Sequence, residues 1–233
     1  MTDIGQMSYF LGIEVKKNED GIFMSQKKYE EKILKKFRME ECKPKSTPAE
    51  PNIKLRVDLT RESVNPTLFK SMVGSPRYLT FTRLDIMYAV GLVSGYMEKL
   101  KQDPFMTAKR ILWYIKGMLD QGLFYMHAQD SKLVGYSDSD YGGDLDDGKI
   151  TSRYAFHLGS AIFSWSSKKQ KTVALSTCEA EYMAAACACQ AMWLGYILSE
   201  LNLTSPIKIY VDNKSVIHLR KIQYHTVEEN TST

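Results

Sequence analysis

The sequence has few of the features that mark secreted, membrane-spanning or zinc-binding proteins. It contains four cysteines in 233 residues, and their spacing matches no zinc site. No run of about 18 apolar residues is present that would cross a bilayer. The first residues lack the basic and apolar segments of a secretory signal. We therefore expect an intracellular protein of the cytoplasm or nucleus, with free thiols at Cys42, Cys178, Cys187 and Cys189.

The sequence also lacks a strong excess of charge of either sign, because its net charge is only +4. The charge is unevenly distributed, however. Residues 1–128 carry 21 Lys and Arg against 15 Asp and Glu, whereas residues 129–233 carry 10 against 12. A basic region attracts polyanions, and clustered acids attract metal ions. This contrast favours nucleic acid over a membrane as the partner.

The hydrophobic pattern of the first region predicts strands and helices up to about residue 130. Two apolar segments flank a polar turn that contains Gly21, which indicates a hairpin. Four prolines between residues 42 and 66 indicate an extended loop. The expected strands are 7–15 and 21–25, and the expected helices are 26–37, 68–79, 86–97 and 104–117. The helix 26–37 carries an apolar face formed by Tyr29, Ile33, Leu34 and Phe37.

The second region, residues 131–233, combines short strands with one long helix. The segment Ser176-Thr177-Cys178-Glu179 matches a capping box, which predicts the start of a helix over 177–200. An apolar stripe rich in alanine along this helix predicts close packing on a sheet. The expected strands are 133–138, 153–158, 161–166 and 207–211. The two regions together predict an α/β fold of two domains.

Three acidic residues follow different structural signals that one sheet edge would bring together. Asp138 ends the strand 133–138, Asp212 follows the strand 207–211, and Glu181 lies in the first turns of the helix between them. Parallel strands joined through a helix have a right-handed connection, so both aspartates should emerge at the same carboxyl edge. Gathered carboxylates repel one another unless a hard divalent cation such as Mg²⁺ binds them. Taken singly, each acid is also explained as a turn-forming or surface residue; the element order favours a shared metal site.

Several motifs resemble the end of a Ty1/copia-type retrotransposon polyprotein. In the second region "GYSDSDYGGDLDD", "FSWSSKKQKTVALSTCEAEYMAAA" and "IYVDNKS" occur in the order of the family's ribonuclease H domain. In the first region "MSYFLGIEV", "GIFMSQKKYEEKILKKF", "SMVGSPRYLTFTRLDIMYAVGLVS" and "AKRILWYIKG" resemble the tail of the family's reverse transcriptase. The resemblance covers residues 1 to about 219.

The resemblance implies a fold, a reaction and a partner. Residues 1–130 would be a palm and thumb–connection remnant of the reverse transcriptase, and residues 131–233 a ribonuclease H-like mixed sheet with helices. Asp138, Glu181 and Asp212 match three of the four acids that hold two Mg²⁺ ions in the family's nuclease, with Mn²⁺ as a substitute. The implied reaction is hydrolysis of the RNA strand of an RNA–DNA hybrid, leaving a 3′-hydroxyl and a 5′-phosphate. The upstream polymerase portion of the polyprotein would be the natural neighbour.

The sequence departs from the family in three ways. The paired aspartates of the polymerase palm are absent, so we expect no polymerase activity. After "VDNKSVIHLRK" the chain runs "IQYHTVEENTST", without the segment that supplies the family's fourth ligand and last helix, so an exposed sheet face is expected. Arg153 stands where the family usually has glycine, and Leu84 where it has proline. Arginine would be strained if that glycine served a left-handed or bulged backbone.

Two groups of basic residues are candidates for contact with a nucleic-acid backbone. One group lies along the helix 104–117, and the other follows the strand 161–166. A solvated helix face and a plain polar loop are the alternative explanations. The candidates are Lys109, Arg110, Lys116, Lys168, Lys169 and Lys171.

Three other functions compete with that of a hybrid ribonuclease. A catalytically inactive remnant of the same element would bind a hybrid without cleaving it. A transposase- or integrase-like enzyme would share the sheet and the clustered acids, but nothing here resembles the placement of its final catalytic acid. An unrelated structural protein would leave the order of the motifs unexplained. Activity must therefore be decided by experiment.

Overall fold

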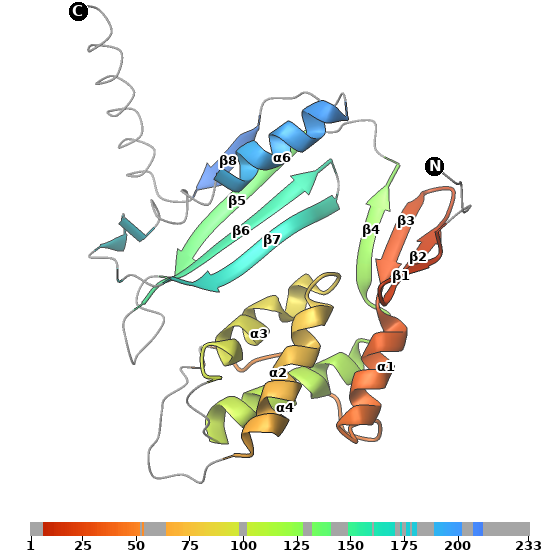
Figure 1. Cartoon of the computed structure of the whole chain (residues 1–233), viewed down its shortest axis with the longest axis vertical. Helices are drawn as coiled ribbons and strands as arrows, with labels where there is room; N and C mark the ends of the chain where they lie inside the picture. The colour runs from red at the N-terminus through yellow and green to blue at the C-terminus, as the bar shows by residue number, and fades with distance from the viewer. Residues whose placement is uncertain are drawn as a thin grey trace, which may run out of the picture. The chain divides into compact units, whose positions relative to one another are not determined.

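In the computed structural model the chain forms two compact units, residues 1–128 and 129–233. Helices and strands occur in both units, so the fold is α/β, as the sequence predicts (Figure 1). The described residues are 7–51, 53, 64–97, 102–127, 132–140, 149–159, 161–170, 173, 176–177, 179–180, 189–201 and 207–211.

Unit 1 contains an antiparallel sheet whose strand order is β1-β2-β3-β4. Its first three strands come from the start of the unit, whereas β4 comes from its end, in a segment where the sequence predicts no strand. A side chain at Gly122 of β4 would lie 2.3 Å from the carbonyl oxygen of Met24, so only glycine allows this close pairing. The strands are β1 (Tyr9–Phe10), β2 (Ile13–Lys17), β3 (Gly21–Ser25) and β4 (Gly122–Met126).

A tight turn at Leu11 and Gly12 divides the segment 7–15, so the prediction of one continuous strand there is wrong. Leu11 has φ of 46° and Gly12 has φ of 82°, a left-handed conformation that glycine adopts readily. The hydroxyl of Tyr78 donates a hydrogen bond to the carbonyl oxygen of Leu11. The hairpin between β2 and β3 forms around the polar turn, as predicted.

Among the described residues of unit 1, four helices and one 3-10 turn form the core, close to the predicted positions. Asn65 caps α2, because its side-chain oxygen accepts hydrogen bonds from the backbone N–H groups of Thr67 and Leu68. The elements are α1 (Lys27–Lys36), α2 (Pro66–Leu79), η1 (Leu84–Ile86), α3 (Met87–Ser94) and α4 (Gln102–Gly117). As predicted for α1, Ile33 and Leu34 are buried in this core, and Tyr29 and Phe37 pack against it.

Unit 2 contains a sheet of strand order β7-β6-β5-β8, in which β5 and β8 are parallel and the other pairs antiparallel. The parallel pair confirms the arrangement expected for the strands that lead to Asp138 and Asp212. Three of the strands are longer than predicted, because the hairpin pairing continues through polar residues. The strands are β5 (Leu133–Asp140), β6 (Thr151–Leu158), β7 (Ala161–Lys169) and β8 (Lys208–Val211).

Helix α6 (Cys189–Glu200) covers one face of this sheet (Figure 1). Ala191, Leu194 and Leu198 of the helix form a buried cluster with Leu133 of β5 and Phe156 of β6. The other face carries a stacked pair of exposed aromatic side chains, Tyr136 and Tyr210, whose ring centroids are 5.4 Å apart. Tyr136 is 49% exposed and Tyr210 is 53% exposed, so this aromatic pair faces solvent in part.

Candidate functional site

Asp138 lies within β5, two residues before the strand ends, rather than at the strand end that the sequence predicts. Its cross-strand neighbour on β6 is Arg153. Arg153 Nη1 donates a hydrogen bond to Asp138 Oδ2 at 3.0 Å, and the two side chains remain 32% and 50% exposed, respectively. The candidate metal ligand is thus held by a half-exposed ion pair.

Arg153 occupies a regular strand position, so the strain that its replacement of glycine suggested is not found. Its backbone is not left-handed, and it pairs in register with Asp138 on one side and Ser167 on the other. The irregularity of this hairpin lies between Phe156 and His157. The extended backbone accommodates arginine and directs its side chain to the same face as its cross-strand neighbours.

On the side of β5 opposite β6, the neighbouring strand is β8, which runs parallel to β5. Ser137 pairs with Val211, and these two residues directly precede Asp138 and Asp212 in the sequence. Tyr136 and Tyr210, one step earlier in the same register, stack on the exposed face. Asp212 itself lies outside the described residues.

A helix start directly before Glu181 in the sequence lies near this end of the sheet. Ser176 Oγ accepts a hydrogen bond from the backbone N–H of Glu179 at 3.1 Å, which confirms the predicted cap. Ala180 is fully buried against Ile150, which directly precedes β6. Thr151, next in β6, pairs with Asp140 of β5. Glu181 follows Ala180 directly and lies outside the described residues.

Two of the three basic candidates in unit 2 lie at the end of β7 rather than in a loop. Lys168 pairs with Ser152 and Lys169 with Thr151, in the part of the sheet that contains Asp138. Lys168 is exposed. Lys171 lies outside the described residues, so its position is untested.

The basic candidates of α4 make contacts within unit 1. Arg110 Nη1 contacts Glu50 Oε1 at 2.9 Å, and the same guanidinium donates hydrogen bonds to the hydroxyl and the carbonyl oxygen of Thr47. The Lys109 ammonium lies 4.6 Å from the centre of the Phe105 ring. Lys116 is half-buried near Cys42. Arg110 therefore holds the 42–51 segment to α4, while a role in nucleic-acid contact stays a prediction for all three.

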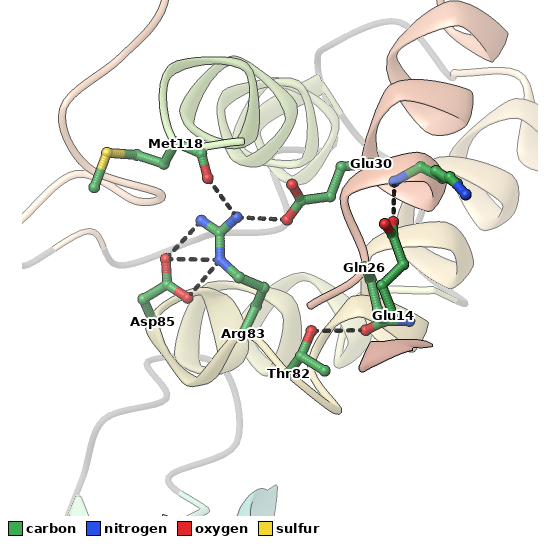
Figure 2. Close-up of polar contacts among 8 residues, drawn as sticks. Glu14, Gln26, Glu30, Thr82, Arg83, Asp85 and Met118 are labelled. Atoms are coloured by element: carbon green, nitrogen blue, oxygen red, sulfur yellow. Dashed lines mark hydrogen bonds and ion pairs between the residues drawn. The ribbon is translucent and has the colours of Figure 1, made fainter. Parts of the chain in front are cut away.

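Unit 1 also contains a buried arginine, Arg83, for which the sequence predicts no role (Figure 2). The Arg83 side chain is 1% exposed and contacts the fully buried Glu30 at 2.6 Å between Nη1 and Oε1. Arg83 also forms an ion pair with Asp85 at 2.8 Å and donates a hydrogen bond to the carbonyl oxygen of Met118 at 2.8 Å. The contacts link α1, the segment before η1 and the end of α4. We call Glu30, Arg83 and Asp85 the buried charge cluster.

The three groups of the buried charge cluster differ in how burial affects them. Burial raises the pKa of Glu30 to about 7, against the opposing effect of Arg83. The pKa of Asp85 is lowered, because hydrogen bonding to Arg83 and its charge outweigh partial burial. The pKa of Arg83 is raised by its two carboxylate partners despite burial. One carboxylate neutralises the guanidinium, so Glu30, the more deeply buried acid, is the one that takes up a proton first.

The donor chemistry of Asp138 fits a divalent cation such as Mg²⁺. Its carboxylate supplies hard oxygen atoms, half of the side chain is exposed, and a half-exposed ion pair of this kind is weak enough to exchange. Among the described residues no three His, Cys, Asp or Glu side chains are grouped closely enough to hold a metal. Glu181 and Asp212, the other two predicted ligands, are not among these residues.

The fold and the site thus define a two-unit α/β protein with a half-exposed carboxylate on its second sheet. A family model described as reverse transcriptase (RNA-dependent DNA polymerase) matches residues 1–51. The chain is 40% identical over 220 residues to the retrovirus-related Pol polyprotein from transposon RE1 of Arabidopsis thaliana, a match that covers 93% of the chain and 15% of that polyprotein.

Two further relatives agree. The chain is 34% identical over 252 residues to the retrovirus-related Pol polyprotein from transposon TNT 1-94 of Nicotiana tabacum, covering 98% of the chain and 19% of the relative. It is also 40% identical over 186 residues to an uncharacterized mitochondrial protein of Arabidopsis thaliana, covering 80% of the chain and 77% of that protein. The chain belongs to the Ty1/copia-type retrotransposon polyprotein family.

The chain corresponds to only part of its polyprotein relatives. The chain spans about 15% of the length of the RE1 polyprotein. No solved structure matches it. None of the described helices is long and apolar enough to cross a membrane.

Proposed function

We propose that unit 2 is a ribonuclease H-type nuclease that hydrolyses the RNA strand of an RNA–DNA hybrid, with Asp138, Glu181 and Asp212 as its metal ligands. Membership of a retrotransposon polyprotein family supports nucleic acid as the substrate class. The compartment in which the reaction would occur is the cell interior, where such a hybrid arises.

The parallel register of β5 and β8 is the observation that carries this proposal. Ser137 and Val211 are paired neighbours, so a register continued by one residue would pair Asp138 with Asp212. Successive residues of a strand alternate between faces, and Tyr136 and Tyr210 share the exposed face. Both aspartates would then point to the side of the sheet that α6 leaves open.

The contact of Ala180 with Ile150 supports the third ligand. This contact brings the first turn of the capped helix to the end of the sheet at which β5 finishes. Glu181 is the next residue in the sequence, so the proposal assigns its carboxylate to this end of the sheet. Three carboxylates from one strand, a helix start and a parallel strand would form a cluster that binds a hard cation.

Two Mg²⁺ ions, or Mn²⁺ in their place, would supply an activated water and stabilise the leaving oxygen in this reaction. The protein's own contribution is to hold the carboxylates in position from a rigid sheet and to orient the hybrid. Lys169 pairs with Thr151 and so shares the face of Arg153 and Asp138, whereas Lys168 lies on the opposite face. The ammonium group of Lys169 would therefore contact the phosphates of the hybrid, and Lys168 would contribute less.

In unit 1, the basic excess supports a duplex-gripping surface that includes Lys109 and Lys116. Arg110 would contribute less, because Glu50 already neutralises its charge. Phosphate contacts release counterions, so the affinity of the chain for a hybrid should fall steeply between low and physiological salt. An affinity that ignores salt would contradict this part of the proposal.

The test is hydrolysis of a labelled RNA–DNA hybrid by the purified chain, in Mg²⁺ and then in Mn²⁺. Asp138→Asn should lower the rate by orders of magnitude, because it removes a charge that the metal needs, while Glu179→Gln serves as a matched control outside the ligand set. Cleavage that survives Asp138→Asn with the same metal dependence would overturn the site. A folded chain that binds the hybrid without cleaving it would instead identify an inactive binding remnant.

A further inference from the structure

Arg153 and Asp138 are direct cross-strand neighbours on the open face of the second sheet. Their hydrogen-bonded contact, 3.0 Å from Nη1 to Oδ2, places a positive charge at the carboxylate that the proposed function assigns to a metal ion. The guanidinium and a divalent cation both require the negative charge of Asp138. They therefore compete for it.

We propose that Arg153 is an internal competing cation, which weakens metal binding at Asp138 and must release the carboxylate before the metal site is complete. This inference rests on the proposed function, because it assumes that Asp138 is a metal ligand. Arg153 acts through Asp138, so it is a positioning residue rather than a catalytic one.

The geometry supports competition rather than permanent blockage. Both side chains are partly exposed, and exposed ion pairs of this type are weak because water and salt screen them. Arginine reaches the carboxylate from a strand position without backbone strain, so no stored distortion drives its release. A divalent cation carries twice the charge and can displace it at sufficient concentration.

The fate of the released guanidinium follows from its position. Arg153 lies in the same part of the sheet as Lys168 and Lys169. A guanidinium that no longer contacts Asp138 has a fork of N–H groups, a geometry suited to two hydrogen bonds with a phosphate group. Metal entry at Asp138 would thus be coupled to an additional contact with the nucleic-acid backbone.

The experiment measures Mn²⁺ binding to the full chain directly, from the electron paramagnetic resonance signal of free Mn²⁺, without substrate. The variants are Arg153→Gln, which removes the charge but keeps hydrogen-bonding groups, and Arg153→Lys, which keeps a charge without the fork. Lys208→Gln is the matched control, because it removes one positive charge from β8 of the same sheet. Asp138→Asn reports whether Asp138 binds metal at all. Circular dichroism melting confirms that each variant is folded.

We expect Arg153→Gln to bind Mn²⁺ roughly two- to tenfold more tightly than the unaltered chain, a range set by the weakness of exposed ion pairs. Lys208→Gln should change the affinity by less than about twofold, since its charge is more distant and screened. The Mn²⁺ affinity of Arg153→Lys should lie between that of the unaltered chain and that of Arg153→Gln. Mn²⁺ affinity that is unchanged in Arg153→Gln but lost in Asp138→Asn would overturn the competition and leave the proposed function intact. Affinity that is unchanged in Asp138→Asn would overturn both.

Discussion

The two units each contain an arginine paired with a carboxylate, and the two pairs differ in burial. Arg83 and Glu30 are almost completely buried, with side chains 1% and 0% exposed, respectively. Arg153 and Asp138 are both partly exposed. Removing one partner of a buried pair leaves an uncompensated charge away from water, whereas water replaces a missing partner at the surface. The same chemistry is therefore structural in unit 1 and exchangeable in unit 2.

The largest expected effect is that of removing the buried guanidinium. Arg83→Met should lower the free energy of unfolding of unit 1 by about 3–5 kcal/mol, because Glu30 and the carbonyl of Met118 lose their donor. Hydrogen–deuterium exchange of α1 and α4 peptides in urea measures this locally. Arg153→Met is the matched control in unit 2 and should change stability by no more than about 1 kcal/mol. Equal losses in the two variants would refute the contrast.

The second effect is a pH dependence confined to the buried charge cluster. Glu30 has an ordinary pKa of 4.5 and a pKa of about 7 in the folded chain, so the folded state binds more protons between these values. The stability of unit 1 should therefore fall by roughly 2 kcal/mol as the pH rises from 4.5 to 7, and then level off. Asp85, whose pKa is lowered, contributes in the opposite direction, below this window.

Glu30→Gln separates this effect from other titrations. The amide keeps the shape of the side chain but does not titrate, so the difference in urea midpoint between pH 5 and pH 7.5 should shrink relative to the unaltered chain. An unchanged pH dependence in Glu30→Gln would show that Glu30 is ionised throughout and that Arg83 outweighs its burial.

The smallest effect concerns salt. A double-mutant cycle between Arg153→Gln and Asp138→Asn should give a coupling free energy of at most about 1 kcal/mol at low salt. In 1 M salt, where the Debye screening length is about 3 Å, this coupling should fall close to zero. A cycle between Arg83→Met and Glu30→Gln, measured by the same denaturation, should keep its coupling in 1 M salt because the pair is shielded from ions. A salt-insensitive coupling at Arg153 would mean that this pair is effectively buried.

Local patterns were sufficient to predict most of the helices and strands. The apolar face of α1, the start of the helix at Ser176 and the parallel relation of β5 and β8 all follow from residue spacing. The turn at Leu11 and Gly12 was not predicted, because the alternation of apolar residues continues through it. A signal was present for Glu30, which lies three residues before Ile33 and four before Leu34, the spacing of one helix face.

Contacts between distant segments could not be predicted in the same way. Arg83 is 53 residues from Glu30 in the sequence, and charged residues are rarely buried. The pairing of Arg153 with Asp138 depends on the register of a hairpin, and a shift of one residue would place the two side chains on opposite faces. Of the three metal ligands that the motifs predict, only Asp138 is among the described residues. The geometry of the other two ligands stays a prediction.

The pairing of β3 with β4 has a consequence for folding during synthesis. Residues 21–25 bond to residues 122–126, so this edge of the sheet closes only after about a hundred further residues have been made. Until then β3 presents free backbone groups that can pair with another chain. Non-local pairing of this kind is slow to form. A nascent chain, or a fragment that lacks residues 122–126, should therefore depend on chaperones more than one that includes them.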